Sequence, residues 1–350
     1  MDAKEFLAKL IETPGISGYE YQVSQEIANA FKPYCDEVMV DDFYNVYGKK
    51  IGGATDRKPK IMLAAHMDEI GLMVKKIEKG GFIKFTNIGG VDPRILPAQE
   101  VWVHGKETLF GVIGAKPPHL QTQAETDKAI PMDDMAIDVG LPEEEVRKLV
   151  NVGDLITFKS PLISMQGDIV NGKSIDDRAG VVLLYQTMQE LDRLKFDAEV
   201  YFVATVQEEV GTRGAIISTY RVNPDIGIAI DVTHANTPDA PREETFPIDK
   251  GPTIAVGPNL HPKLTKKLMD VAKENNIEFH TEVEPGPTGT DARSMQISRA
   301  GVPTVLIGLP LRYMHTTVES LSMSTIKKSA KLLALFIASM EEGWEQWLSY

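Results

Sequence analysis

The sequence predicts an α/β fold in which a mixed sheet is sandwiched by helices and a small β domain is inserted. Three observations predict it. After Gly172, short apolar runs alternate with amphipathic helical patterns, which is typical of a sheet covered by helices. Between Gly71 and Lys159, short runs of alternating polarity are separated by glycine and proline turns, as in small all-β units. An apolar run of the buried-strand type precedes this insert at residues 60–65.

The N-terminal segment predicts two helices and that buried strand. Apolar residues recur at helical spacing over residues 4–12, and a proline–glycine pair ends this helix. A second amphipathic helix follows Ser17 and Gly18. The strand at residues 60–65 runs directly into His66.

The remainder of the chain predicts the rest of the sheet. The insert contains one acidic helix, at residues 142–150. Later helices are predicted at residues 177–191, 264–274 and 324–344, and strands at 199–206, 225–230 and 302–307. We therefore expect one α/β domain formed by residues 1–70 and 166–350, interrupted by a β-barrel-like domain at residues 71–165.

Charge and composition exclude some classes of partner. Asp and Glu number 50 against 37 Lys and Arg, and the net charge of −13 argues against nucleic acid or a membrane as the main partner. The single cysteine, Cys35, fits a reducing compartment. The N-terminal segment lacks the pattern of a signal peptide, and no stretch of about twenty apolar residues occurs. The sequence therefore predicts a cytoplasmic protein.

Side chains that can bind metal ions occur at five places, each after a predicted strand or at the start of a helix. These places are His66 with Asp68, Asp176 with Asp177, Glu208 with Glu209, Asp231 with His234, and His315. In open α/β sheets, ligands bind outside the carboxyl ends of the strands. We therefore expect these side chains to converge at one edge of the sheet.

The types of side chain favour a centre with two metal ions. Imidazole and carboxylate groups without a cysteine suit zinc, cobalt or manganese. One ion needs about three protein ligands, and the available groups exceed that number, so two ions sharing a carboxylate is the natural arrangement. Asp176 and Asp177, viewed alone, also fit a helix N-cap. Glu208 and Glu209 would repel each other unless one binds a metal ion and the other handles a proton.

At these residues the chain resembles the glutamyl/tetrahedral aminopeptidase family of dinuclear metallopeptidases, some members of which carry an endoglucanase label. The resemblance spans nearly the whole chain. The matching segments include residues 14–20 (PGISGYE), 65–71 (AHMDEIG), 174–180 (SIDDRAG), 205–211 (TVQEEVG), 230–233 (IDVT) and 313–317 (YMHTT).

The resemblance implies a role for each metal-binding side chain. Asp176 would bridge the two ions, with Asp177 as the alternative. His66 and Asp231 would complete one site, and Glu209 with His315 would complete the other. The resemblance implies two divalent ions per subunit, zinc or cobalt, which share the same set of ligands.

The resemblance also implies the catalytic groups. Glu208 would be the general base acting on a water that bridges the metal ions. Asp68 would form a hydrogen bond with His66 and fix its tautomer. The implied activity is a metal-dependent aminopeptidase that removes the N-terminal residue of short peptides. The inserted domain would be a dimerisation domain, and the dimers would assemble into dodecamers.

Two other activities remain open on the same residues. A metal-dependent N-acyl amino acid deacylase would use the same site, and only the need for a free α-amine separates the two readings. A glycosidase could use two carboxylates as acid and base. The chain has only three tryptophans to line a sugar cleft, and glycoside hydrolysis leaves His66 and His315 without a role.

Overall fold

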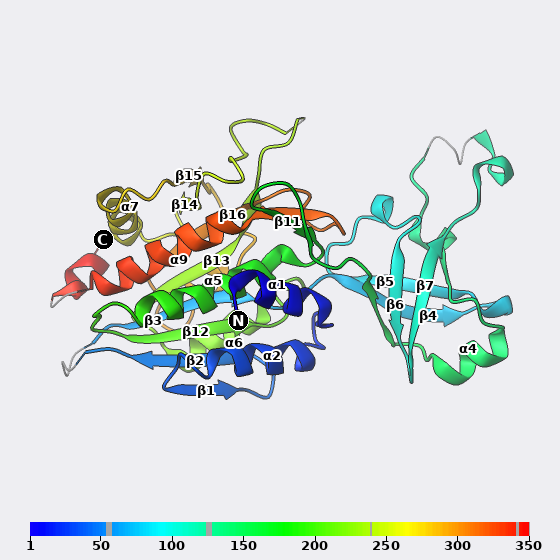
Figure 1. Cartoon of the computed structure of the whole chain (residues 1–350), viewed down its shortest axis with the longest axis horizontal. Helices are drawn as coiled ribbons and strands as arrows, with labels where there is room; N and C mark the ends of the chain where they lie inside the picture. Colours follow the sequence, from blue (N-terminus) through cyan, green and yellow to red (C-terminus); the bar gives the residue numbers. More distant parts are fainter. Residues whose placement is uncertain (54–57, 124–127, 239, 341–342, 350) are drawn as a thin grey trace.

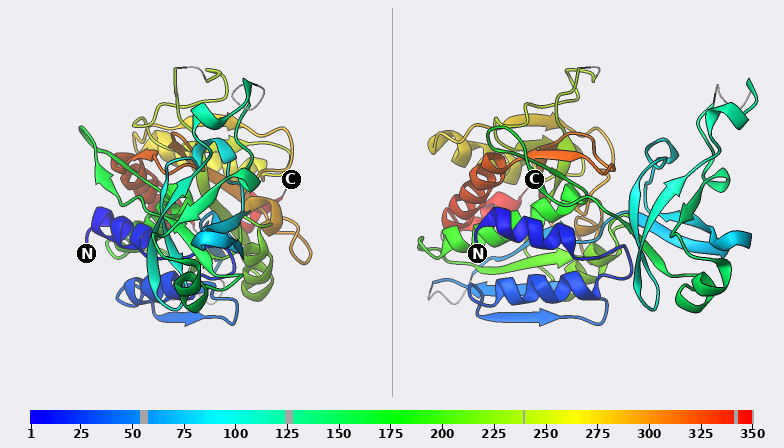
Figure 2. Two further views of the ribbon diagram at one scale, coloured as in Figure 1. Left: turned by 90° about the vertical axis from the view of Figure 1, so that its right-hand side faces the viewer. Right: turned by 45° about the vertical axis from the view of Figure 1, so that its right-hand side comes forward.

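Two bodies make up the chain, a large α/β body and a smaller barrel that lies beside it (Figure 1). The computed structural model describes residues 1–53, 58–123, 128–238, 240–340 and 343–349. The barrel projects from one end of the α/β body, and the two chain termini both lie on the α/β body (Figure 2). Over the described ranges, no helix is both long and apolar enough to cross a membrane.

An eight-stranded mixed sheet forms the centre of the larger body. Its four middle strands, β12, β3, β13 and β16, run parallel, whereas β2 and β14 run antiparallel to their neighbours in this set. In spatial order the strands are β1 (Glu37–Val40), β2 (Val46–Ile51), β12 (Glu199–Thr205), β3 (Lys60–His66), β13 (Ile226–His234), β16 (Thr304–Leu311), β14 (Thr253–Val256) and β15 (His280–Val283).

Helices cover both faces of this sheet, as the sequence predicts. The helices packed on one face are α1 (Ala3–Glu12), α2 (Tyr21–Phe31), α5 (Ile175–Leu191), α7 (Pro262–Glu274) and α9 (Met323–Ala338). The other face carries α6 (Arg213–Val222) and α8 (Ala292–Met295). Alternation along β3 shows how one strand serves both faces, because Ile61 and Leu63 pack toward α5 while Met62 and Ala64 pack toward α6.

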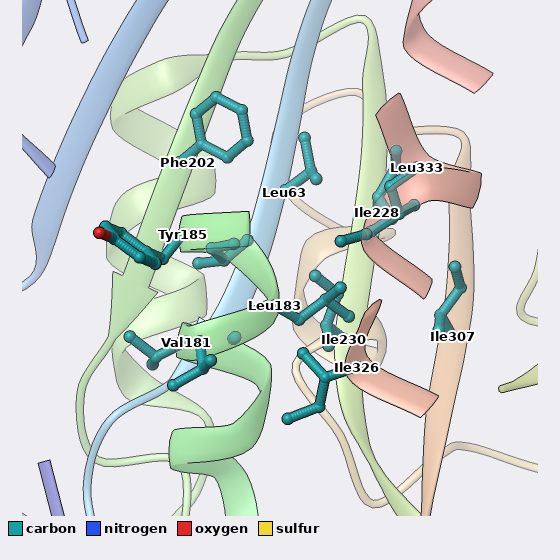
Figure 3. Packing of buried hydrophobic residues seen from close by; sticks show 14 of the residues in the cluster. Leu63, Val181, Leu183, Tyr185, Phe202, Ile228, Ile230, Ile307, Ile326 and Leu333 are labelled. Atoms are coloured by element: carbon teal, nitrogen blue, oxygen red, sulfur yellow. The ribbon is translucent and has the colours of Figure 1, made fainter. Parts of the chain in front are cut away.

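The larger core lies between the sheet, α5 and α9 (Figure 3). Fully buried side chains from all three elements meet there, including Leu63, Ile228, Ile230, Val181, Leu183, Ile326 and Leu333. Burying one such side chain stabilises the fold by about 1.5–3 kcal/mol. This packing fixes the sheet whose strand ends carry the candidate site.

The inserted unit is a closed six-stranded barrel with a core of its own. In spatial order its strands are β4 (Gly71–Ile77), β5 (Ile83–Ile88), β8 (Ala136–Asp138), β7 (Thr108–Gly114), β6 (Glu100–His104) and β9 (Leu155–Phe158). The acidic helix α4 (Glu143–Leu149) packs near β4. The predicted fold class, an α/β sheet with an inserted small β domain, is thus confirmed.

A short sheet joins the segment after the barrel to a late part of the chain. It consists of β10 (Ile163–Ser164), β11 (Ile169–Gly172) and β17 (Glu319–Ser322). β11 runs antiparallel to β17, with Gly172 opposite Glu319. The start of α5 therefore lies beside the loop that follows β16.

Three predicted boundaries are wrong. The predicted strand at residues 302–307 ends too early, because β16 continues to Leu311. The predicted strand at residues 225–230 is too short, because β13 continues to His234 while still paired with β16. The predicted helix at residues 324–344 is too long, because α9 ends at Ala338 and residues Trp344–Leu348 form a separate 3₁₀ helix. The hydroxyl of Ser339 donates a hydrogen bond to the Phe336 carbonyl, which competes with continuation of the helix.

Candidate active site

All five predicted places contribute to one cavity of about 460 Å³ in the α/β body. β3 ends at His66, β12 leads into Glu208, and Asp231 lies within β13. The predicted side chains that line the cavity are His66, Asp176, Glu208, Glu209, Asp231, His234 and His315. The convergence expected from the parallel strands is therefore observed, although Asp231 lies inside its strand and not at the end.

Asp176 lies between two histidines. Its Oδ1 atom is 3.1 Å from Nε2 of His66, and its Oδ2 atom is 3.3 Å from Nε2 of His315. The two oxygens of one carboxylate therefore face two different imidazoles. A carboxylate placed in this way could give one oxygen to each of two ions.

Two groups of potential metal ligands share this residue. The first group is His66, Asp176 and Asp231, and the second is Asp176, Glu209 and His315. Within each group, one ligand atom from each residue lies within 4.8 Å of the others. Imidazole nitrogen and carboxylate oxygen, three per group, match the protein ligands of a catalytic zinc-type site.

Asp177, the alternative bridging residue, lies outside both groups. Its Oδ1 atom accepts a hydrogen bond of 2.9 Å from the backbone N–H of Gly180, one turn along α5. Its carboxylate is fully buried. The structure thus places Asp176, and not Asp177, between the two histidines.

The cavity carries more negative charge than its histidines balance. Burial raises the pKa of Asp231 well above its ordinary value, and the neighbouring carboxylates of Asp177 and Asp176 raise it further. Burial also raises the pKa of Glu209, with Asp176 adding to the effect and His315 opposing it. Divalent cations would supply the missing positive charge, so the residues present fit a metal centre.

Asp68 organises the loop that carries both glutamates. Its Oδ1 atom accepts the N–H of Glu208 at 3.0 Å, and its Oδ2 atom accepts the N–H of Glu209 at 3.2 Å. The hydroxyl of Ser17 donates to the same Oδ2 at 2.6 Å. The Nδ1 atom of His66 lies 3.2 Å from the Asp68 carbonyl oxygen and 3.5 Å from Oδ1. Asp68 therefore contacts His66, but its carboxylate mainly orients the glutamate loop.

Sequence reasoning missed two buried glutamates that support the site. Glu20 accepts hydrogen bonds from the N–H groups of Gly18, at 2.8 Å, and Gln207, at 3.0 Å. This contact ties the N-terminal PGISGYE segment to the loop of the paired glutamates. Glu319 accepts hydrogen bonds from two backbone N–H groups of the site. No spacing rule identifies either residue, because each glutamate joins a nearby backbone N–H group to one in a distant segment.

Another cavity, of about 530 Å³, lies between α1 and the barrel. Its lining includes Ile11, Trp102, Phe158 and Lys173. The two carboxylate–histidine groups lie outside it. The smaller, charged cavity is therefore the candidate active site.

Comparison with known proteins places this geometry in a family. The model of the M42 glutamyl aminopeptidase family matches residues 45–332. The chain belongs to that family. Lysyl aminopeptidase of Pyrococcus furiosus is 36% identical over 96% of this chain and 97% of its own length.

Solved structures agree with this result. The TET aminopeptidase of the archaeon Thaumarchaeota archaeon SCGC AB-539-E09 has a TM-score of 0.93 and 32% identity, covering 99% of this chain and 98% of that chain. The TET1 peptidase of Pyrococcus horikoshii, which can assemble into a tetrahedron or a large octahedral shell, has a TM-score of 0.84 and 33% identity, covering 97% of this chain and 100% of that chain. The prediction of a peptide-bond hydrolase of the aminopeptidase type is confirmed.

Proposed function

We propose that this M42 aminopeptidase removes the N-terminal residue of short peptides with two divalent ions and Glu208 as general base. The observation that carries this proposal is the position of Asp176, whose two oxygens face His66 and His315. His66, Asp176 and Asp231 would hold one ion. Asp176, Glu209 and His315 would hold the other. Zinc and cobalt both suit these ligands.

Each protein group has a separate task. Ions bound in the two groups would activate a water molecule and polarise the scissile carbonyl. Glu208 lines the same cavity, and its backbone N–H is held by Asp68. Its carboxylate would take a proton from the attacking water and deliver one to the leaving amine. Asp68 would keep that carboxylate aimed at the reacting atoms.

The charge of the cavity favours substrates with a free amine. Besides the two ligand groups, the carboxylates of Glu282 and Glu284 contribute to its lining. The ions would neutralise the ligand carboxylates, but the carboxylates of Glu208, Glu282 and Glu284 outnumber the one guanidinium group in the lining and would attract the positively charged α-amino group of a peptide. N-acylated substrates lack this charge, so the lining supports the aminopeptidase over the deacylase reading.

We further propose that residues 1–70 and 166–350 form the catalytic domain and that the barrel within residues 71–165 mediates self-association into a dodecamer. The barrel exposes several apolar side chains, among them Phe82 and Phe110, at 45% and 43% exposure. Assembly of the related TET1 peptidase into closed shells supports this proposal. A closed shell would admit short peptides and exclude folded proteins. The single cysteine supports a cytoplasmic location.

The test compares aminoacyl-p-nitroanilides with their N-acetylated counterparts. The metal-free protein is assayed alone and after addition of zinc or cobalt, beside Glu208→Gln. We expect metal-dependent cleavage of the free-amine compounds only. Glu208→Gln should keep both ions and lose about 10²–10⁴-fold in kcat, because it removes the general base.

Each outcome has a definite meaning. Faster cleavage of the acetylated compounds would establish the deacylase reading. A Glu208→Gln variant that keeps the wild-type kcat would remove the general base from the proposal. A metal-loaded protein that cleaves neither set would contradict peptide substrates of this kind.

A further inference from the structure

Glu319 is a buried carboxylate at the start of β17, only 2% exposed. Its Oε2 atom accepts a hydrogen bond of 3.1 Å from the backbone N–H of Asp176. Its Oε1 atom accepts one of 2.9 Å from the backbone N–H of His315. One carboxylate therefore joins two segments of the site that lie far apart in the sequence.

Both donors need such an acceptor. Asp176 lies at the beginning of α5, where backbone N–H groups have no partner within the helix. His315 lies in a tight loop with φ of +60°, a left-handed conformation that is uncommon for a histidine. A buried N–H group without a partner destabilises the conformation that leaves it unpaired. Glu319 thus stabilises the particular backbone positions of both residues.

The position of Glu319 is itself fixed by the short sheet. In the β11–β17 ladder, Glu319 lies opposite Gly172, four residues before Asp176. Asn171 adds side-chain hydrogen bonds to the Val318 carbonyl, at 2.6 Å, and to the Ser320 hydroxyl, at 3.0 Å. The ladder therefore holds the carboxylate between the two segments.

We propose that Glu319 is a positioning residue that sets the distance between the side chains of Asp176 and His315. The inference rests on the proposed function, in which both residues hold an ion. Asp176 and His315 are two of the three residues in the group that contains Glu209. The other group includes Asp176 but not His315. The contact of Glu319 with His315 therefore acts on one ion site only.

The substitution Glu319→Gln tests this role with little change in shape. A carboxylate can accept from both N–H groups, whereas an amide has one oxygen and one NH₂ group. The NH₂ group would then face the backbone N–H of either Asp176 or His315, and two donors cannot form a hydrogen bond with each other. Loss of a hydrogen bond that orients a metal ligand typically costs 10- to 100-fold in metal affinity. We expect about this loss at the site that includes Glu209.

The experiment is a cobalt titration of the full-length, metal-free protein in a metal buffer. Cobalt absorption bands report the ligand environment, and elemental analysis reports the number of ions bound. We expect the wild type to bind two ions. Glu319→Gln should bind the ion at the site that includes Glu209 about 10- to 100-fold more weakly. The other site shares only Asp176 with that group, so its affinity should fall by much less. At high cobalt concentration, kcat should recover while KM stays unchanged.

A control separates positioning from general damage to the sheet. Asp168→Asn alters a carboxylate that accepts from Ser322 and Ser324 beside the same strand, remote from the ion site. This variant should bind both ions normally. If Glu319→Gln does not fold, Glu319→Asp serves as a second variant. Its shorter side chain keeps the charge but cannot reach both backbone amides.

The outcomes distinguish the inference from the proposed function. A wild-type protein that binds fewer than two ions contradicts both. If the wild type binds two ions, unchanged affinity in Glu319→Gln at the site that includes Glu209 contradicts the positioning role alone. Equal weakening of both sites, with a lowered Tm of the metal-free variant, would show a purely structural role and also overturn the inference.

Discussion

Replacement of Asp68 by asparagine tests how the glutamate loop is oriented. Asp68 is fully buried and accepts three hydrogen bonds, from the N–H groups of Glu208 and Glu209 and from the hydroxyl of Ser17. An asparagine side chain has one acceptor oxygen where the aspartate has two. At least one backbone N–H of the loop would therefore face an NH₂ group.

The magnitude follows from the contacts. If the NH₂ group replaces Oδ2, the hydroxyl of Ser17 can turn and accept, so only the hydrogen bond from the Glu209 N–H is lost. A hydrogen bond to a charged group contributes about 1.5–3 kcal/mol. For a chain of 350 residues, this loss in the free energy of unfolding lowers Tm by about 2–4 °C. Movement of the loop should lower kcat about 10- to 100-fold.

Calorimetry and steady-state kinetics check these values. KM should stay near the wild-type value, because Asp68 is not part of the cavity lining. Ser17→Ala is the control, since it removes one donor to Asp68 but leaves both loop N–H groups paired. It should lower the free energy of unfolding by about 1.5–3 kcal/mol, as expected for one hydrogen bond to a charged group, and leave kcat close to that of the wild type. Wild-type kcat in Asp68→Asn, or an equal loss of kcat in Ser17→Ala, would show that the hydrogen bonds between Asp68 and the loop do not orient the glutamates.

Three further changes have defined outcomes. Although burial opposes it, Arg178 and Lys173 hold the pKa of Glu69 at about 2, below its ordinary value of 4.5. Its contribution to stability is therefore present at neutral pH and is lost as the pH falls from about 4.5 toward 2. Glu69→Gln should remove this pH dependence. It should also lower the free energy of unfolding at pH 7 by about 3–5 kcal/mol, because two buried cations lose their partner. If urea unfolding of the variant showed the same dependence of stability on pH as the wild type, this prediction would be contradicted. Ile228→Ala, at a side chain with 0% exposure, should cost about 2–5 kcal/mol in urea unfolding, and a cost near zero would refute the packing described. A chelator should abolish peptide cleavage and lower Tm, with both restored by zinc or cobalt, whereas full activity after chelation would contradict metal dependence.

The fold class follows from local sequence patterns, because each buried strand leaves a short apolar run. The run at residues 60–65 predicts β3 almost to the residue. The boundaries at the C-terminal ends of β13 and α9 do not follow, since polar residues such as Asp231 continue the strand through its pairing with β16. The missed helix end depends on Ser339, whose hydroxyl competes for a backbone carbonyl in a way that hydrophobic periodicity does not record.

The sequence predicts most residues of the candidate site, as it predicts most elements of the fold. Side chains at strand ends could be brought together by the rule for parallel sheets, which explains the expectation for His66 and Glu208. The residues alone do not distinguish Asp176 from Asp177, because the two are adjacent and chemically identical. The family resemblance implies Asp176, and in the structure Asp176 is the residue whose oxygens face both histidines. The sequence does not predict the role of Glu319, because this role depends on the backbone N–H of Asp176, which only the β11–β17 pairing brings close to the loop of His315.

Anomalous diffraction from crystals of the cobalt- or zinc-loaded protein, measured at the absorption edge of the metal, tests the two-ion centre most directly. A two-ion centre gives two peaks in each subunit, one on either side of Asp176. The first should lie against His66 and Asp231, and the second against Glu209 and His315. A single peak, or a pair of peaks without Asp176 between them, would contradict it.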